Sequence, residues 1–301
     1  MELTYKSCNI CPRGCGVDRE STLGVCRSGA KPVISRVSRH LYEEPAICGA
    51  GGAGPVFFSG CNLGCVFCQN SVISQRSVGR EFDGDELAEL FLTVAESGVA
   101  TLDLVTPTHF TPTVAAALSL VKDKLTIPVV WNSSGYESVQ SLSLLRGLVD
   151  IYLPDFKYYS PELSAKHSHA ADYRERAEEA LLYMYDMLGS PIVDGDGMMK
   201  KGVIVRHLVL PGHRNDSIAC LRRLAEILPA SDIRLSLMRQ YTPDFYTGDD
   251  KNLRRRVTSF EYESVLRETV ELGFDGYMQS AEAASAKYTP EFSDTFSIDL
   301  T

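Results

Sequence analysis

The sequence predicts an α/β protein built around a parallel β-sheet, and two observations lead to this fold class. Short apolar segments alternate along most of the chain with longer segments whose apolar residues recur at helical spacing. Successive strand–helix units of this kind form right-handed βαβ connections, which place the strands parallel. Polar residues follow the predicted strands in otherwise apolar surroundings, as expected where the carboxyl ends of parallel strands form a functional site.

The first unit begins with a short apolar strand, predicted over 56–59, directly before a loop rich in cysteine. Asp83 then precedes a helix as its N-cap, and Glu86 follows three residues later, which is the spacing of a capping box. Apolar residues recur at helical spacing from Leu87 onward, and Gly98 ends the helix.

The later units repeat this alternation. Strands are predicted over 101–106, 127–131, 151–153, 203–210, 233–238 and, last, 274–278. Helices are predicted from Thr111-Pro112 onward and over 138–145, 174–188, 218–228 and 262–272. Asp194-Gly-Asp-Gly197 predicts the tip of a hairpin.

Composition limits the class of protein. The 301 residues are 44% hydrophobic, enough for one large core or two modest ones. The net charge of -9 argues against nucleic acid or an anionic membrane as the main partner. The N-terminus does not resemble an export signal, and no apolar run approaches the roughly 20 residues of a membrane span. We expect a soluble, cytoplasmic protein with a cysteine-rich N-terminal segment (1–50), an α/β domain (51–280) and a C-terminal tail (281–301).

Cys61, Cys65 and Cys68 form the most informative motif of the chain. Three thiolates on a loop that also carries Gly60 and Gly64 suit a [4Fe–4S] cluster, which normally takes four cysteines. Three protein ligands leave one iron open for chemistry. The alternative is a zinc site, but zinc would require a fourth close ligand and usually two paired Cys-x2-Cys units. We therefore favour the cluster.

Four further cysteines form a complete ligand set within the N-terminal segment: Cys8, Cys11, Cys15 and Cys26. Such a set predicts a second metal site, either a structural zinc or an auxiliary [4Fe–4S] cluster. Ligand spacing does not separate the two, and we favour the cluster. A pair of disulfides is the alternative, which the odd total of nine cysteines disfavours.

The remaining candidate ligands receive simpler interpretations. Cys48 and Cys220 are predicted to be buried free thiols. His167 and His169 could bind metal, but their polar surroundings favour a solvated loop. His109 is predicted either to face the substrate as a proton donor or to be a hydrogen-bonded histidine at a strand end.

Polar residues at five strand ends form a further pattern. They occur in Thr106-Pro-Thr-His109, Asn132-Ser-Ser-Gly135, Asp155-Phe-Lys157, Arg206-His207 and Arg239-Gln240. A charged residue within a buried strand requires a partner or a ligand. Because parallel strands bring these ends to one edge, the set predicts an active site there.

These motifs resemble the radical S-adenosylmethionine (SAM) superfamily, in which the sequence Cys-x3-Cys-x-aromatic-Cys carries Phe67 in the aromatic position. In that superfamily the open iron binds the amino and carboxylate groups of SAM. More specifically, residues from about 5 to 280 resemble pyruvate formate-lyase-activating-enzyme-like proteins, with an extra N-terminal cysteine segment. The resemblance is carried by the cysteine motif, by the polar strand ends and by Val205-Arg-His-Leu-Val-Leu-Pro-Gly212. It implies a partial (β/α)6 barrel.

The resemblance also implies roles for individual residues. Arg206 corresponds to the arginine that pairs with the SAM carboxylate, and Asp155 and Lys157 match an Asp-x-Lys pattern beside the methionyl group. Asn132 is expected to help anchor that group. Phe67 and Gln240 are expected to flank the adenine. Thr106, Thr108 and Ser134 are the other residues expected to contact SAM. True activators have a Gly-Gly-Glu segment after the second strand, whose acid and backbone hold the SAM amino group. In this sequence the segment is Thr106-Pro-Thr-His109, which contains no acid.

The implied function is reductive cleavage of SAM to a 5′-deoxyadenosyl radical, which takes hydrogen from a substrate. An electron donor of the flavodoxin or ferredoxin type is the implied partner. One possibility is an activating enzyme that places a glycyl radical on a protein; another is an enzyme that acts on a small molecule or a different macromolecule. A non-catalytic metal-binding module is disfavoured, because it has no need of the charged strand ends.

Overall fold

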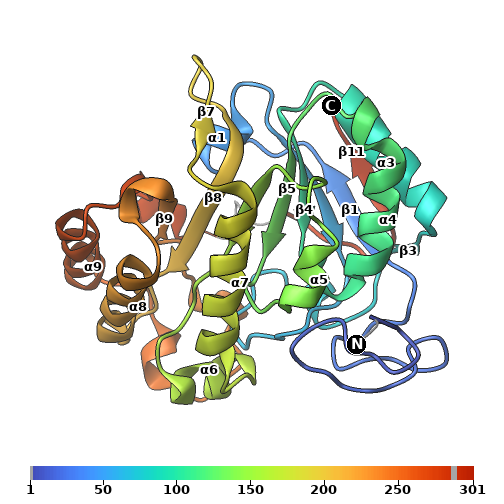
Figure 1. The fold of residues 1–301 in the computed structure, drawn as a ribbon. Coiled ribbons are helices and arrows are strands. Elements are labelled where there is room, and N and C mark those ends of the chain that lie inside the picture. Colours follow the sequence, from blue (N-terminus) through green and yellow to red (C-terminus); the bar gives the residue numbers. More distant parts are fainter. Residues whose placement is uncertain (1–2, 286–289) are drawn as a thin grey trace.

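The computed structural model describes residues 3–285 and 290–301. Seven strands lie side by side in parallel, in the order β2, β4, β5, β6, β8, β9 and β10 (Figure 1). Their bounds are Ala53–Phe58, Thr101–Val105, Val129–Ser133, Ile151–Pro154, Met199–Leu208, Arg234–Met238 and Asp275–Met278. Within the described residues the two ends of this sheet do not pair with each other. The protein is therefore an α/β fold whose parallel strands form a partial barrel, as predicted.

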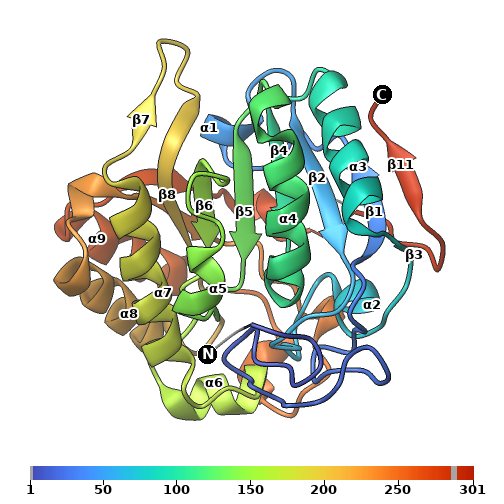
Figure 2. The same cartoon turned by 45° about the vertical axis from the view of Figure 1, so that its right-hand side comes forward.

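Helices connect the parallel strands, and α4, α5 and α7 lie in front of the sheet in both views (Figures 1 and 2). The connecting helices are α3 (Gly84–Glu96), α4 (Thr111–Val121), α5 (Val139–Ser143), α6 (Pro161–Ser168), α7 (Tyr173–Leu188), α8 (Arg214–Ile227) and α9 (Ser259–Glu271). Asp83 and Glu86 form the predicted capping box of α3. A second capping box, of Thr258 and Glu261, begins α9.

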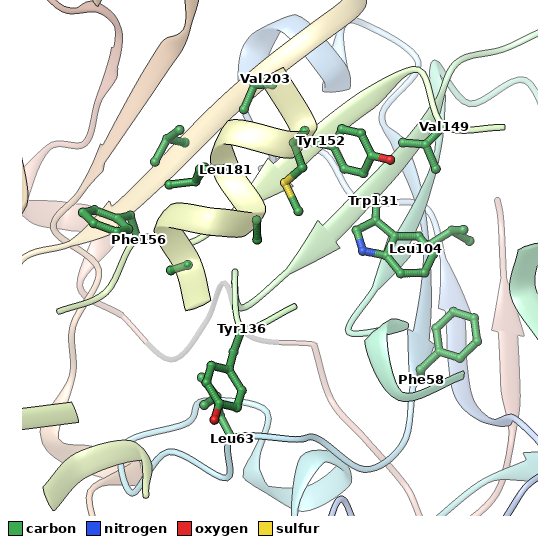
Figure 3. Close-up of a cluster of buried hydrophobic side chains, with 14 of the residues drawn as sticks. Phe58, Leu63, Leu104, Trp131, Tyr136, Val149, Tyr152, Phe156, Leu181 and Val203 are labelled. Atoms are coloured by element: carbon green, nitrogen blue, oxygen red, sulfur yellow. The ribbon is translucent and has the colours of Figure 1, made fainter. Parts of the chain in front are cut away.

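The core lies between the sheet and these helices. Figure 3 shows Trp131 and Tyr152, from neighbouring strands, in one buried cluster with Leu181 of α7 and Val203 of β8. All four side chains are buried. The Trp131 indole donates a hydrogen bond to buried Glu137 over 3.1 Å, so that the largest core side chain also has a polar partner.

Two strands extend the sheet beyond the predicted units. β1 (Val33–Ser38) pairs antiparallel with β2, and β11 (Ser297–Asp299) pairs parallel with β1. These strands come from the segments that the sequence assigns to the N-terminal region and the C-terminal tail. The boundaries at 50 and 281 remain predictions, but β1 joins the N-terminal segment to β2 of the central sheet, and β11 joins the C-terminal tail to β1.

Short elements complete the described structure. They are α1 (Pro45–Cys48), α2 (Ser71–Ser74), β3 (Arg80–Glu81), β7 (Ile192–Val193) and short 3-10 helices at Thr108–Phe110, Lys122–Lys124, Ala230–Asp232, Pro243–Phe245, Lys251–Arg254 and Ala281–Ala283. β7 and β8 form a hairpin whose tip contains Asp194 and Gly197, as predicted. No described helix has the length and apolar composition that crossing a membrane requires.

The N-terminal segment, residues 3–32, contains no regular helix or strand and lies at the end of the molecule toward which the arrows of β2 and β5 point (Figure 2). It is attached there by hydrogen bonds from Arg13 to the carbonyl oxygens of Asn62 and Ser168. The carboxyl ends of the parallel strands are therefore covered by a cysteine-rich segment.

Candidate active site

The three-cysteine loop follows β2 at the carboxyl edge of the sheet. Gly60 begins the loop with a φ of 82°, and a Cβ atom there would lie 2.1 Å from Ser28 Oγ. Only glycine allows both the backbone conformation and this close approach of the N-terminal segment. The Cys61 amide then donates to the Cys26 carbonyl over 3.1 Å. The backbone of the N-terminal segment thus holds the loop at its first cysteine.

The thiols of this loop have the surroundings of metal ligands. No disulfide involves any of the described cysteines. Ser168 donates to Cys65 Sγ over 2.9 Å, and Ser74 donates to Cys68 Sγ over 3.3 Å. Burial raises the pKa of Cys65 to about 12, although the positive charge of Lys157 acts in the opposite direction. Three thiols that line one cavity, two of them with hydroxyl donors, suit an iron–sulfur cluster, whose iron takes the place of the thiol protons.

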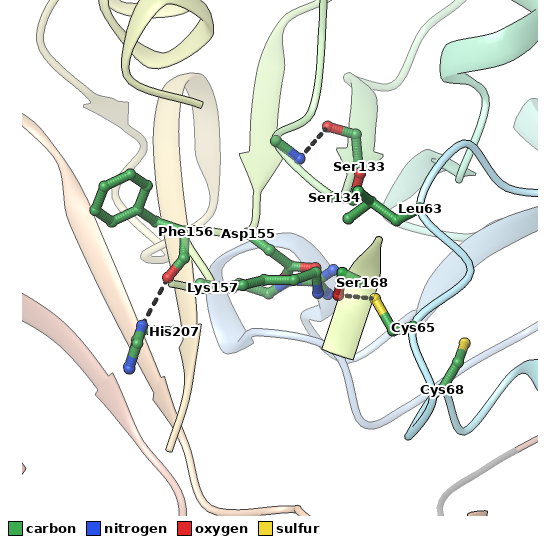
Figure 4. Close-up of polar contacts among 12 residues, drawn as sticks. Leu63, Cys65, Cys68, Ser133, Ser134, Asp155, Phe156, Lys157, Ser168 and His207 are labelled. Atoms are coloured by element: carbon green, nitrogen blue, oxygen red, sulfur yellow. Dashed lines mark hydrogen bonds and ion pairs between the residues drawn. The ribbon is translucent and has the colours of Figure 1, made fainter. Parts of the chain in front are cut away.

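A charged network lies across from the thiols, at the ends of β5, β6 and β8. Asp155 accepts from Lys157 Nζ over 2.5 Å and from Arg206 Nε over 3.1 Å. Arg206 also donates to Asn132 Oδ1 over 2.6 Å. Burial alone would raise the pKa of Asp155, but the two neighbouring cations outweigh it and hold the pKa below its usual value. Figure 4 shows the Lys157 side chain extending toward the contact between Ser168 and Cys65.

Buried acids that the sequence analysis missed complete this network. Glu43 Oε2 lies 3.8 Å from Arg206 Nη1, and Asp103 accepts from Asn132 over 3.3 Å. Burial raises the pKa of Glu44 to about 6, and its Oε2 has no hydrogen-bond partner. The sequence feature that could have identified Glu43 and Glu44 is their position as two adjacent acids directly before Pro45, a residue that restricts the backbone.

A cavity of about 200 Å³ separates the cysteine loop from the charged network. Its lining includes all three cysteines of the loop and all of the predicted SAM contacts except Thr108, namely Phe67, Thr106, Asn132, Ser134, Asp155, Lys157, Arg206 and Gln240. Thr106 has a φ of 61° at the end of β4. A β-branched residue rarely adopts this conformation, and such strained positions concentrate at functional sites.

Two predicted polar residues at the end of β4 do not line this cavity. Thr108 is buried and donates to Glu137 over 2.7 Å, so that its hydroxyl supports the core. His109 is buried with Nε2 2.9 Å from the Ser59 carbonyl oxygen. Burial lowers the pKa of His109 to about 3. The interpretation as a hydrogen-bonded strand-end histidine therefore agrees with the structure, and the interpretation as a proton donor facing the substrate does not.

The prediction of a solvated loop at His167 and His169 is wrong for His167. This residue lies in α6 and is buried, whereas His169 is exposed just beyond the helix. The polar sequence around His167 concealed this burial, because it results from packing against residues distant in the chain. Cys48 and Cys220 are buried free thiols, as predicted.

A second cavity of about 490 Å³ adjoins the first. The two share residues in their linings, among them Glu43, Arg206 and Gln240. Glu44 lines the second cavity, opposite Tyr277 and Gln279 from the C-terminal end of the sheet. A molecule in the second cavity would therefore lie directly beside the charged network.

The four N-terminal cysteines line neither cavity, and one of them lies beside a buried cation. Cys8, Cys11 and Cys26 are buried and Cys15 is partly exposed. Arg19 is only 2% exposed and places Nη1 3.8 Å from Cys8 Sγ. The same guanidinium donates to the carbonyl oxygens of Ser28, Gly29 and His109. A fixed cation of this kind stabilises thiolates.

Comparison with known proteins identifies the family. The sequence profile of the Radical SAM superfamily matches residues 56–225, more than half of the chain. The chain belongs to the radical SAM superfamily. An uncharacterized protein of Methanocaldococcus jannaschii is 30% identical over 273 residues, which are 87% of this chain and 74% of that protein. Membership implies a [4Fe–4S] cluster and SAM as cofactors, and the three thiols and the cavity before them fit these groups.

A solved structure of a radical SAM enzyme shares the fold. A radical SAM methyltransferase from Sphaerobacter thermophilus matches with a TM-score of 0.51 at 13% identity, over 75% of this chain and 66% of the methyltransferase. SuiB of Streptococcus suis, in a structure bound to SAM, matches with a TM-score of 0.48 at 11% identity, over 78% of this chain and 51% of SuiB. The chain thus spans about half to two thirds of these enzymes. The matches do not distinguish an activating enzyme from other radical SAM enzymes.

Proposed function

We propose that this radical SAM enzyme cleaves SAM reductively and uses the resulting 5′-deoxyadenosyl radical to take hydrogen from a substrate in the second cavity. The observation that carries the proposal is the position of Cys61, Cys65 and Cys68 across one cavity from the network of Arg206, Asp155 and Lys157. When bound, the cluster and SAM would supply the electron transfer and the radical. The protein would bind, orient and enclose them.

Arg206 and Asn132 are the proposed anchors of the SAM carboxylate. Arg206 is fixed by Asp155, and a guanidinium held in this way presents its remaining donors in a defined plane. Lys157 would lie close to the cluster thiolates. Phe67 and Gln240 line the same cavity and are the proposed neighbours of the adenine.

Glu43 is our candidate for the acid that binds the SAM amino group. The segment that supplies this acid in activating enzymes is Thr106–His109 here, and it contains no carboxylate. Glu43 lines the SAM cavity beside Arg206. An acid and an arginine 3.8 Å apart suit the amino and carboxylate groups of one amino acid, which are bonded to the same carbon.

Two classes of substrate follow from this geometry. The Arg206 and Asp155–Lys157 pattern resembles activating enzymes, which would act on a glycine of a partner protein. The second cavity, with its buried Glu44, favours instead a small molecule or a single side chain of a larger target. A ferredoxin- or flavodoxin-type protein is the proposed electron donor in either case.

For the N-terminal cysteines we propose an auxiliary iron–sulfur cluster. Four thiolates bring a large negative charge to such a site, and the buried guanidinium of Arg19, 3.8 Å from Cys8 Sγ, would partly offset it. The same four ligands also suit a zinc ion, which metal analysis would identify.

The decisive experiment is anaerobic reconstitution with iron and sulfide, followed by dithionite and SAM without substrate. We expect slow release of 5′-deoxyadenosine and methionine, measured by mass spectrometry. A protein that holds a full cluster at the three-cysteine loop but neither binds nor cleaves SAM would contradict the proposal. Addition of candidate amines, peptides or a glycyl-radical enzyme would then separate the substrate classes, because only a substrate that donates hydrogen accelerates the release.

A further inference from the structure

His167, His213 and Asp250 form a cluster outside the SAM site. His167 lies in α6, His213 directly before α8, and Asp250 directly before the 3-10 helix Lys251–Arg254. One ligand atom from each lies within 4.8 Å of the others. The cluster therefore joins three segments that are far apart in the sequence, and none of its members lines either of the two cavities described above.

The separations within the cluster are those of ligands around one metal ion. Asp250 Oδ2 lies 3.1 Å from His213 Nε2 and 3.6 Å from His167 Nε2. Zinc binds imidazole nitrogen and carboxylate oxygen at about 2.0–2.2 Å, and two such ligands at a tetrahedral angle lie about 3.4 Å apart. The two measured separations bracket this value.

His167 supplies the observation that a simple ion pair leaves unexplained. Its side chain is 1% exposed, and neither ring nitrogen has a hydrogen-bond partner. A buried polar group without a partner destabilises the folded state, because it has lost its hydrogen bonds to water. The contact between His213 and Asp250 satisfies those two residues but not His167. A metal ion between the three would give Nε2 of His167 a partner.

We propose that His167, His213 and Asp250 bind a divalent transition-metal ion, with Zn²⁺ as the preferred ion. Two imidazoles and one carboxylate are typical zinc ligands and leave one position for water. This site goes beyond the radical SAM chemistry and does not depend on it.

The location assigns the ion a structural role beneath the cysteine loop. The amide of Val66 donates to the His167 carbonyl over 3.0 Å, and the Val66 carbonyl accepts from the Thr247 amide over 2.9 Å. The His167 ring also lies 6.5 Å from the ring of Phe67. A metal that holds α6 to the segment around Asp250 therefore fixes the loop between Cys65 and Cys68 from both sides.

The test uses the full chain with its iron–sulfur sites reconstituted anaerobically, incubated with Zn²⁺ and passed through a desalting column. We expect the native protein to retain one zinc per chain more than Asp250→Asn and more than His213→Ala. His169→Ala is the matched control, because this exposed histidine is two residues from His167; it should retain the zinc of the native protein. Co²⁺ in place of Zn²⁺ should give ligand-field absorption without thiolate charge transfer.

A thermal measurement gives an independent readout. Zn²⁺ should raise the unfolding temperature of the native protein and of His169→Ala by roughly 5–10 °C at a hundredfold excess over Kd. It should raise that of Asp250→Asn, a nearly isosteric change, by much less. Equal zinc content and equal thermal shifts in all four proteins would overturn the proposal, as would cobalt spectra that show only thiolate ligands. Because two different ligand variants are compared, misfolding of one leaves the other as the test.

Discussion

The two cysteine-rich regions of this protein lie side by side but face different surroundings. The three-cysteine loop opens onto a cavity bordered by Arg206, Lys157, Glu43 and Asp155. The N-terminal set of four does not line either described cavity, and its Cys8 lies 3.8 Å from the buried guanidinium of Arg19. The first region is incomplete as a ligand set but rich in groups that bind a charged cofactor. The second is complete, and none of its cysteines lines either of the two cavities described above. Cysteine number alone would not separate a reactive site from a supporting one; the neighbouring charges and the open space do.

The largest effect should follow removal of the three-cysteine loop ligands. In the triple variant Cys61→Ala, Cys65→Ala, Cys68→Ala, SAM cleavage should fall to the level without protein, because the cluster site is lost. Iron and sulfide should fall by one cluster per chain while the metal of the N-terminal set remains. Cys48→Ala, which alters a buried thiol outside both sets, is the control. Unchanged iron and sulfide contents in the triple variant would show that the three-cysteine loop does not hold a cluster.

The next largest effect concerns the charged side of the cavity. Arg206→Ala should weaken SAM binding by roughly 1.5–3 kcal/mol, or about 10- to 150-fold, the usual contribution of a charge-assisted hydrogen bond. Cluster absorbance should be retained. Equilibrium binding by ultrafiltration measures the change, and Arg222→Ala serves as control because its side chain is 62% exposed and far from both cavities. Normal SAM binding by Arg206→Ala would indicate that Lys157, and not Arg206, binds the SAM carboxylate.

A smaller effect on catalysis is expected from the N-terminal set. Replacement of Cys8, Cys11, Cys15 and Cys26 by serine should remove one metal centre and lower the unfolding temperature. The rate of SAM cleavage per remaining cluster should be unchanged when dithionite supplies electrons. The metal content of the variant and its rate of SAM cleavage per remaining cluster test this prediction. If the rate per cluster also falls to zero, the two regions form one functional unit, and the distinction between them fails.

The smallest effect is a pH dependence of stability caused by Glu44. Burial raises its pKa to about 6 from an ordinary value of 4.5. The folded state therefore holds this proton more tightly than the unfolded state, and the resulting stabilisation is lost as pH rises from about 4.5 through 6. The loss amounts to about 2 kcal/mol. Melting temperatures between pH 4.5 and 7.5 should show this slope in the native protein and a weaker slope in Glu44→Gln.

Glu89→Gln is the control for this measurement, since Glu89 is exposed on α3 and its replacement should leave the slope unchanged. Parallel curves for native protein and Glu44→Gln would show that Glu44 is ionised at little cost in the folded state.

Local sequence signals were sufficient for the strands and helices that connect successive units. Capping residues and helical periodicity identified α3, and a continuous apolar run identified β4, because each signal lies within the element itself. β1 and β11 were not predicted, because neither carries a sufficient signal within itself. β11 has only three residues and pairs with β1, which lies more than 250 residues earlier in the chain. The same limit applies to the site. The residues on strand ends were predicted from their position, whereas Glu43 and Glu44 lie in a loop that carries no recognised motif. The burial of His167 depends on residues 46 and 83 positions later and was not apparent from its own polar surroundings.

The hydrogen bond from the Cys61 amide to the Cys26 carbonyl makes one backbone proton a reporter on both cysteine-rich regions. An amide exchanges with solvent deuterium only when its hydrogen bond opens. Opening at Cys61 requires the N-terminal segment to move away from the three-cysteine loop, since Gly60 leaves no space between them. The exchange rate of this single amide therefore measures how often the two cysteine regions separate. Metal binding at either region should slow that exchange.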